Sequence, residues 1–102
     1  MIIGVLTLTF RLHDNRSLKG KRQTANSLKQ KLRNKFNVAV SEIEAQDDPK
    51  RLVLALATVA NETRKVESRL SKALAMIEAV ATEEMIDSHM EIFSASQGRN
   101  GR

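Results

Sequence analysis

Residues 52–60 read LVLALATVA, and both alternating sets of side chains in this stretch are apolar. A strand with one face in water alternates apolar and polar residues, so this pattern predicts a central strand with both faces covered or nearly covered. The segment before it, residues 46–49, is polar and ends in Pro49, which suits a tight turn. We therefore predict a central strand over residues 51–60.

A second strand is predicted on the other side of this turn, over residues 36–46. Its apolar residues fall into two alternating sets, which are Phe36, Val38 and Val40 in the first and Ile43 and Ala45 in the second. One extra residue within the strand brings both sets to the same face. We therefore predict a β-bulge around Ser41.

Two helices are predicted where apolar residues recur every three to four positions. The first covers residues 17–35 with Ser17 as its N-cap, and the second covers residues 62–81 with Asn61 as the candidate N-cap. Gly20 stands three residues after Ser17, where a capping box has Glu or Gln, so that box is incomplete. Each helix has one apolar stripe, which is expected to pack on a sheet.

The last two strands are predicted near the two ends of the chain. Residues 2–12 alternate and have a second face that is also rather apolar, whereas residues 85–93 are polar on one face and suit a sheet edge. Strand, helix, strand, strand, helix, strand is the ferredoxin-like order. It predicts an α+β two-layer sandwich, with two helices on one face of an antiparallel four-stranded sheet and the first and third strands at its centre. We predict one domain over residues 1–93 and a disordered tail over residues 94–102, which have no apolar anchor.

The composition excludes several chemistries. The 102 residues include no cysteine, which excludes disulfides, thiolate metal sites and a cysteine nucleophile. Three Phe are the only aromatic residues, which argues against base stacking on single-stranded nucleic acid. The apolar residues 2–10 are interrupted by Thr7 and Thr9 and lack a basic segment before them, so they suit a strand rather than a signal peptide or membrane span. We expect a cytoplasmic protein without a membrane partner.

Positive charge is concentrated in one quarter of the chain. Residues 11–35 contain nine basic residues and one acid, a net charge of +8, whereas the other eight basic and eleven acidic residues give −3. Such an asymmetry favours an anionic partner, although a solvated basic face that keeps the protein soluble is the alternative. The candidate phosphate-binding residues are Arg16, Lys19, Lys21, Arg22, Lys29 and Arg33.

Lys21 differs from the other candidates because its helical angle falls within the apolar stripe of the first helix. Long basic side chains extend their charged ends past apolar surface into water. We therefore expect Lys21 to reach past the sheet edge and to present its ammonium beside Arg16 and Arg22.

Catalytic and metal-binding patterns are missing from the sequence. His13 and His89 are the only imidazoles, and neither has the spacing that brings several ligands to one face. Ser17 lies near His13, but no nucleophile elbow surrounds it, and capping explains it more simply. The glycines form no phosphate-binding loop. We predict no catalytic residue, no metal and no cofactor.

Three segments form a distinctive combination, namely RSLKGKR at residues 16–22, LRNKFNVAVSEIEAQD at residues 32–47 and VANE at residues 59–62. Together they resemble the YlxP-like family of small bacterial proteins, a domain of unknown function. The resemblance implies a ferredoxin-like fold and a gene neighbourhood with transcription-elongation, translation-initiation and ribosome-maturation factors, but no established activity. Gly20 and Ala45 depart from the family pattern, where an acidic residue and a histidine are common.

Our leading hypothesis is a non-enzymatic, RNA-associated accessory protein in ribosome assembly or translation. Because aromatic residues are scarce, we expect recognition of structured RNA through its shape and backbone. The alternative is a protein-interaction or dimerisation module without nucleic-acid contact. An enzyme ranks third: the fold also hosts acylphosphatases, but this sequence has no glycine-rich phosphate loop followed by Arg.

The sheet face without helices leads to a further expectation. In a two-layer fold this face is polar if the monomer is the final state. Yet the first strand has Ile3 and Val5 outside its core-facing set, and residues 52–60 have a full second apolar row. We therefore expect a homodimer through the open sheet face. The alternative is that Ala55, Ala57 and the threonines keep this face small enough to remain wet.

Overall fold

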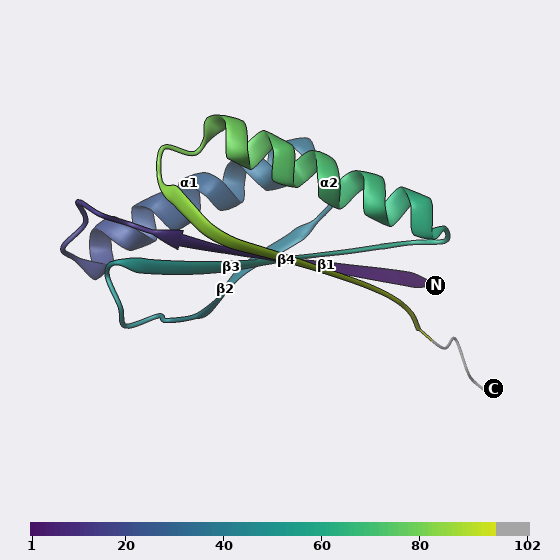
Figure 1. The fold of residues 1–102 in the computed structure, drawn as a ribbon, viewed down its shortest axis with the longest axis horizontal. Coiled ribbons are helices and arrows are strands. Elements are labelled where there is room, and N and C mark those ends of the chain that lie inside the picture. Colours follow the sequence, from purple (N-terminus) through teal and green to yellow (C-terminus); the bar gives the residue numbers. More distant parts are fainter. Residues whose placement is uncertain (96–102) are drawn as a thin grey trace.

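The predicted order of elements is confirmed by a computed structural model, which describes residues 1–95 (Figure 1). The elements are β1 (Ile2–Arg11), α1 (Leu18–Lys35), β2 (Ala39–Glu44), β3 (Arg51–Ala60), α2 (Thr63–Val80) and β4 (Glu84–Ser94). β4 ends one residue later than predicted, and the Ala95 N–H donates to the Met1 carbonyl at 2.9 Å. The rest of the predicted disordered tail, residues 96–102, lies outside the described residues.

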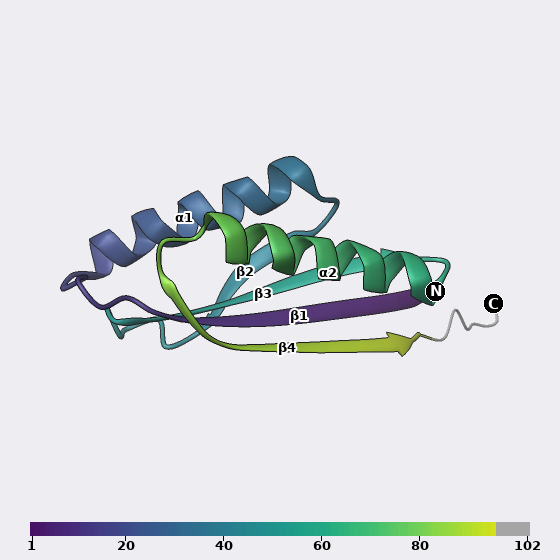
Figure 2. The same cartoon turned by 45° about the horizontal axis from the view of Figure 1, so that its top comes forward.

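The sheet has the predicted antiparallel arrangement, with strand order β2-β3-β1-β4. β1 and β3 lie at the centre, as their apolar patterns indicate. Both helices cover the same face of the sheet, with α1 packed over β2 and β3 and α2 packed over β1, β3 and β4 (Figure 2). The fold is therefore a ferredoxin-like two-layer sandwich with one open sheet face.

Both edge strands contain an irregularity. The β2–β3 register shifts between Glu42 and Glu44, which confirms the predicted bulge close to Ser41. The bulge does not bury Ile43 beside Val40, however, because Ile43 is 45% exposed and Val40 is 8% exposed. A second shift, which the sequence did not indicate, occurs in β4, where Thr9 pairs with Asp87 but Phe10 pairs with Met85. Bulges bend and twist an edge strand and make it a poorer template for strand addition.

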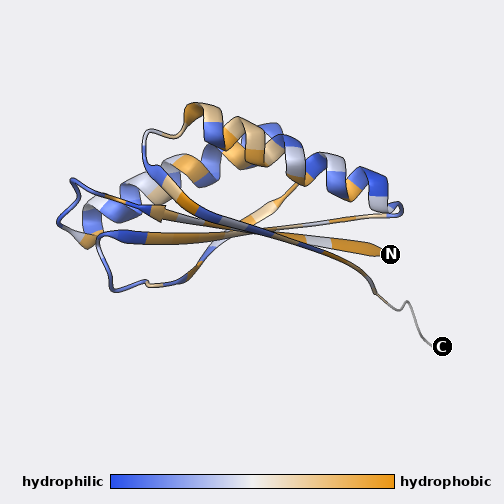
Figure 3. Cartoon of the chain, in the orientation of Figure 1, coloured by the Kyte–Doolittle hydropathy of each residue, from blue (hydrophilic) through white to orange (hydrophobic). Residues whose placement is uncertain are grey.

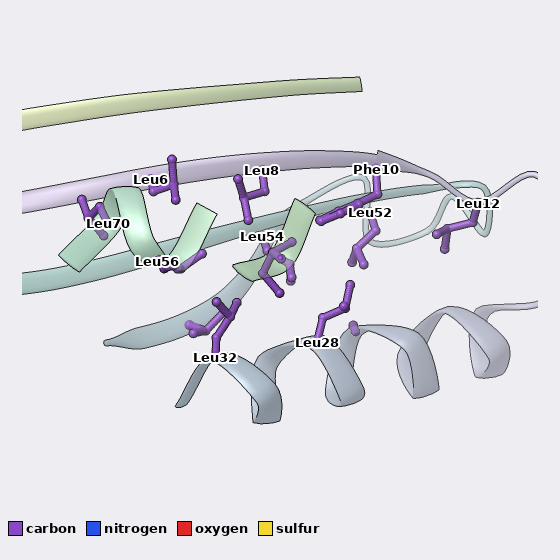
Figure 4. Packing of buried hydrophobic residues seen from close by; sticks show 14 of the residues in the cluster. Leu6, Leu8, Phe10, Leu12, Leu28, Leu32, Leu52, Leu54, Leu56 and Leu70 are labelled. Atoms are coloured by element: carbon purple, nitrogen blue, oxygen red, sulfur yellow. The ribbon is translucent and has the colours of Figure 1, made fainter. Parts of the chain in front are cut away.

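The core is a leucine layer between the central strands and the helices (Figure 4). Facing pairs between β1 and β3 form the centre of its sheet side, namely Leu6 with Leu56, Leu8 with Leu54 and Phe10 with Leu52. Each of these side chains is at most 1% exposed. The helices contribute Leu28 and Leu32 from α1 and Leu70 and Ile77 from α2. Apolar burial of this kind is the main stabilising contribution to folding.

Gly4 allows α2 to lie close to β1. A Cβ atom at this position would overlap the Val66 side chain and would lie 2.8 Å from Cδ1 of Leu70. Glycine inside a strand often marks such a close approach of a packed element.

The second helix begins one residue later than expected. Its N-cap is Glu62, which makes no side-chain capping hydrogen bond, so the prediction of Asn61 as the cap was wrong. The Asn61 side chain instead accepts a hydrogen bond from Nζ of Lys65 at 3.5 Å.

Within residues 1–95, no helix has the length and the apolar composition that a membrane-spanning helix needs.

Candidate nucleic-acid interface

The start of α1 is fixed by side chains of the preceding loop. Oγ of Ser17, the predicted N-cap, accepts a hydrogen bond from the Gly20 N–H at 3.0 Å. The Asn15 amide donates to the Ser17 carbonyl at 2.8 Å and to the Pro49 carbonyl. A Cβ at Gly20 would overlap Oδ1 of Asn15. The Asn15 side chain occupies the space that a side chain at position 20 would need. A glycine therefore fits at this position.

The basic residues of α1 lie on one flank of the helix. At about 100° per residue, Lys19, Arg22, Lys29 and Arg33 fall in one sector. We call these four residues, together with Arg16 before the helix, the basic ridge. Lys29 is partly buried and the other four are exposed. Hydrophilic and hydrophobic residues alternate along α1 in Figure 3.

The basic ridge faces away from α2. On the opposite flank of α1, Thr24 and Lys31 line a shallow depression together with Val80, at the end of α2. No acidic residue occurs between positions 18 and 35, so helix α1 has no internal ion pair to neutralise the ridge. The ridge is consequently an uncompensated positive surface beside the β2 edge of the sheet.

Lys21 does not belong to this surface. Its side chain is 1% exposed and lies under α1, so the prediction that it presents its ammonium beside Arg16 and Arg22 was wrong. Nζ donates to the carbonyls of Ala45, Gln46 and Arg51 at 2.5, 3.1 and 3.3 Å. It also lies 3.0 Å from Oε2 of Glu42. The residue points inward because the β2–β3 turn and the strand residues Glu42 and Arg51 beside it offer the ammonium four oxygens.

The β2–β3 turn is built around this ammonium. Ala45 has a φ of 55°, the left-handed region that non-glycine residues rarely adopt. Its carbonyl accepts hydrogen bonds from Nζ of Lys21 and from the Asp48 N–H, the latter at 3.0 Å. These two hydrogen bonds help to hold Ala45 in a conformation that costs about 1 kcal/mol or more.

A second positive surface, which we had not predicted, lies on α2. A shallow groove between α2 and the end of α1 is lined by Phe36, Arg64, Lys65, Ser68, Arg69 and Lys72. We call it the α2 groove. In sequence order these cations alternate with acids and look neutralised. At about 100° per residue, however, Glu67 lies on the other flank from Lys65 and Lys72, so a helical projection could have found the groove. Glu62 lies 3.4 Å from the Arg64 guanidinium and 3.5 Å from Nζ of Lys65, so the charge of these two cations is partly balanced.

Arg69 is the anchored residue of the α2 groove. Its guanidinium donates to Oγ1 of Thr58 and to the Val59 carbonyl, the latter at 3.2 Å. The Thr58 hydroxyl in turn donates to the Asn37 carbonyl at 2.9 Å, which ties α2 and β3 to the segment after α1. A guanidinium has five N–H donors, so Arg69 keeps donors for an anion while its position is fixed.

Each histidine lies near the carboxylate of a different residue, and the two histidines do not share a ligand site. Nε2 of His13 lies 2.5 Å from Oε1 of Glu84, and Nε2 of His89 lies 3.6 Å from Oε2 of Glu91. No group of three potential metal ligands occurs in the described part of the chain. The hydroxyl of Ser17 accepts the capping hydrogen bond at the start of α1. These distances suit surface contacts of His13 in the loop after β1 and of His89 in the edge strand β4.

The open sheet face has an apolar row at one end. Ile3 pairs with Val59 on one side and with Phe93 on the other, so these three residues lie across β3, β1 and β4. Val59 is 55% exposed and Phe93 is 48% exposed. Val53, which shares this face further along β3, is only 1% exposed. Toward the other end of the sheet, Ile43 and Ile86 at the two edge-strand bulges are 45% and 43% exposed.

A family model described as "Protein of unknown function (DUF503)" matches residues 3–90. The chain belongs to this family. It is 33% identical over 78 residues to the Bacillus subtilis (strain 168) protein named "Uncharacterized protein YlxP", an alignment that covers 76% of this chain and 85% of YlxP. The resemblance to the YlxP-like family is thereby confirmed. The basic ridge and the α2 groove both lie within the part of the chain that the DUF503 model matches.

Solved structures of low sequence identity share the DUF503 chain's fold. A candidate antibiotic biosynthesis monooxygenase from Deinococcus radiodurans has a TM-score of 0.51 and 15% identity, with 100% of this chain and 99% of that chain covered. A second such protein, from Chloroflexus aurantiacus, has a TM-score of 0.50 and 12% identity, with coverages of 94% and 97%. At these identities the similarity concerns the ferredoxin-like fold alone.

Proposed function

We propose that this protein is a non-enzymatic, RNA-associated accessory protein that acts near ribosome assembly or translation and binds RNA phosphates through the basic ridge. The observation that carries the proposal is the one-sided exposure of Arg16, Lys19, Arg22 and Arg33 on or before a helix without acidic residues. Lys and Arg bind phosphates, and the resulting affinity does not depend on sequence.

The scarcity of aromatic residues supports a structured RNA rather than a single strand. Stacking of unpaired bases needs exposed aromatic rings. Of the three Phe residues, Phe10 is fully buried and Phe93 lies on the open sheet face, away from the helices. Phe36 is partly buried at the end of α1. Recognition of the phosphate backbone and of helical shape therefore fits this surface best.

Ultraviolet cross-linking of the purified protein to ribosomal RNA, followed by mass spectrometry of the linked peptides, tests the proposal. We expect the linked peptides to come from residues 16–35, because the basic ridge lies there. An acidic protein, added in excess over the RNA, serves as the competitor. No cross-link above background, or complete competition by the acidic protein, would contradict the RNA-binding role.

A second proposal concerns self-association, because Val59 and Phe93 are exposed on the open sheet face. We propose that a second copy of the chain covers the row of Ile3, Val59 and Phe93 in a twofold dimer. Exposed apolar groups on neighbouring strands favour such burial, and twofold dimers are the commonest closed assemblies. The dimer would leave the helical face, and so the basic ridge, open to RNA.

A further inference from the structure

The solvent-facing side of α1 carries a row of uncharged hydrogen-bonding side chains. Gln23, Asn26, Ser27, Gln30 and Asn34 are all exposed. Together with Lys31 they line one shallow depression of the surface. We call these five residues the amide stripe. Because its members are exposed, their donors and acceptors are open to an incoming ligand.

The amide stripe lies between two positively charged flanks. At about 100° per residue, Asn26, Gln30 and Asn34 follow one line along the helix. Arg22, four residues before Asn26, begins the same line. Lys29 and Arg33 of the basic ridge border it on the side away from α2, and Lys31 borders it on the side toward α2. Beyond Lys31, at the end of α1, lies the α2 groove. A ligand on the stripe would therefore meet neutral donors and acceptors in the middle and cations on both sides.

Helix stability does not account for the amide stripe. Asn and Ser compete with the helical backbone for hydrogen bonds and are weaker helix formers than Ala, Lys or Glu. Two Asn and one Ser nevertheless stand at exposed positions inside α1, where packing does not select them. Their presence there is explained if they contact a ligand.

We infer that the amide stripe binds the minor groove of an RNA duplex, with the phosphates of the two strands held by the basic ridge on one side and by Lys31 and the α2 groove on the other. This inference rests on the proposed function and names its ligand. The A-form minor groove is wide and shallow and displays 2′-hydroxyl groups, each a donor and an acceptor. Side-chain amides are matching partners for such groups.

The shape of the helical layer favours RNA over DNA. α1 and α2 both pack on one sheet face and diverge toward the end of α1, so α1 is part of a helical layer rather than a projecting helix (Figures 1 and 2). Reading B-DNA requires a helix to enter a major groove about 8.5 Å deep. A helix that is part of a layer can instead lie against a shallow groove, and the A-form minor groove is shallow.

The test compares the full-length parent with a variant that combines Asn26→Ala, Gln30→Ala and Asn34→Ala. Binding is measured to an RNA duplex of about 16 base pairs, the span of two minor grooves, and to a DNA duplex of the same sequence. We expect the variant to lose about tenfold in RNA affinity, because each net hydrogen bond contributes roughly a factor of two or more. Its salt dependence should match the parent's, since no phosphate contact is removed.

A matched control combines Thr63→Ala with Ser71→Ala, which removes exposed polar groups from α2 instead. We expect this control to bind as the parent does. Thermal unfolding checks the amide variant, which should be at least as stable as the parent because Ala favours helix. A folded variant with unchanged RNA affinity, or a parent that prefers the DNA duplex, would overturn the inference and leave the basic ridge as a phosphate site. A parent that binds neither duplex would overturn both proposals.

Discussion

The ammonium of Lys21 lies 3.0 Å from the Glu42 carboxylate beneath the first turn of α1. An ammonium has three protons, and the Lys21 protons are directed to the backbone carbonyls of Ala45 and Gln46 in the β2–β3 turn and of Arg51 at the start of β3. Oε2 of Glu42 is buried and accepts no directed hydrogen bond, so it balances the charge through its proximity. Lys21 is therefore a structural residue that joins α1 to the turn.

Replacing Lys21 with Met should destabilise the protein strongly. The substitution leaves the Glu42 carboxylate and three carbonyls without their cation, and breaking a buried pair from one side costs about 3 to 5 kcal/mol. Glu42→Gln should cost less, because Lys21 keeps its three carbonyls. Urea unfolding of both variants checks this order. Equal stability of Lys21→Met and the parent would show that the buried contacts do not hold the turn.

Replacing Ala45 with Gly should stabilise the protein slightly. Ala45 has a φ of 55°, which costs a residue with a Cβ roughly 1 to 2 kcal/mol. Glycine removes this cost but adds about 0.4 to 1 kcal/mol of entropy to the unfolded chain. We expect a net gain of about 0.5 kcal/mol in the free energy of unfolding. A clear loss of stability would indicate that the turn is held differently.

The fold could be predicted from the sequence because its signals are local. The alternation of residues 52–60 and the change of phase in β2 predicted the central strand and the bulge, and both are confirmed. Lys21 could not be placed in this way. Its partners are carbonyls at positions 45, 46 and 51, and no pattern in the sequence shows which carbonyls a folded turn directs inward.

The candidate interface was only partly accessible to sequence reasoning. Charge counting singled out the basic ridge but not the α2 groove, because Glu62 stands just before the cations of the groove and Glu67 stands between them. The amide stripe has no charge and no motif, so a composition argument cannot detect it. It is recognised only when α1 is oriented on the sheet and its exposed side is known.

Replacing Gly4 with Ala should destabilise the packing of α2 on β1. The added methyl group would overlap Val66 and crowd Leu70, and overpacking a core costs about 1 to 3 kcal/mol. Gly20→Ala should cost less. There the obstructing atom belongs to the end of the Asn15 side chain, and Ala favours a helix by up to about 1 kcal/mol. Thermal unfolding of the two variants measures the difference, and a larger loss at Gly20 would contradict the packing role of Gly4.

Combining Val59→Thr with Phe93→Gln should weaken self-association. We expect the parent to sediment as a dimer at micromolar concentration, and the variant to shift toward the monomer because the apolar row is lost. Val80→Thr is the matched control, since Val80 is 42% exposed but lies at the end of α2. A parent with a monomer mass at every concentration rules out the dimer.

The salt dependence of RNA binding tests the role of the basic ridge most directly. It is measured with total ribosomal RNA for the parent and for a variant in which Lys19, Arg22, Lys29 and Arg33 are replaced by Gln. A control variant with Gln at Arg11, Lys50 and Arg51 removes exposed cations from β1, the β2–β3 turn and β3 instead. If the ridge holds about four phosphates, its variant should bind more weakly, with a log-log salt slope flatter by roughly 3 units, while the control stays close to the parent. Equal affinity and equal slope for the ridge variant and the parent would contradict phosphate binding by the basic ridge and leave the ridge as a solvated face.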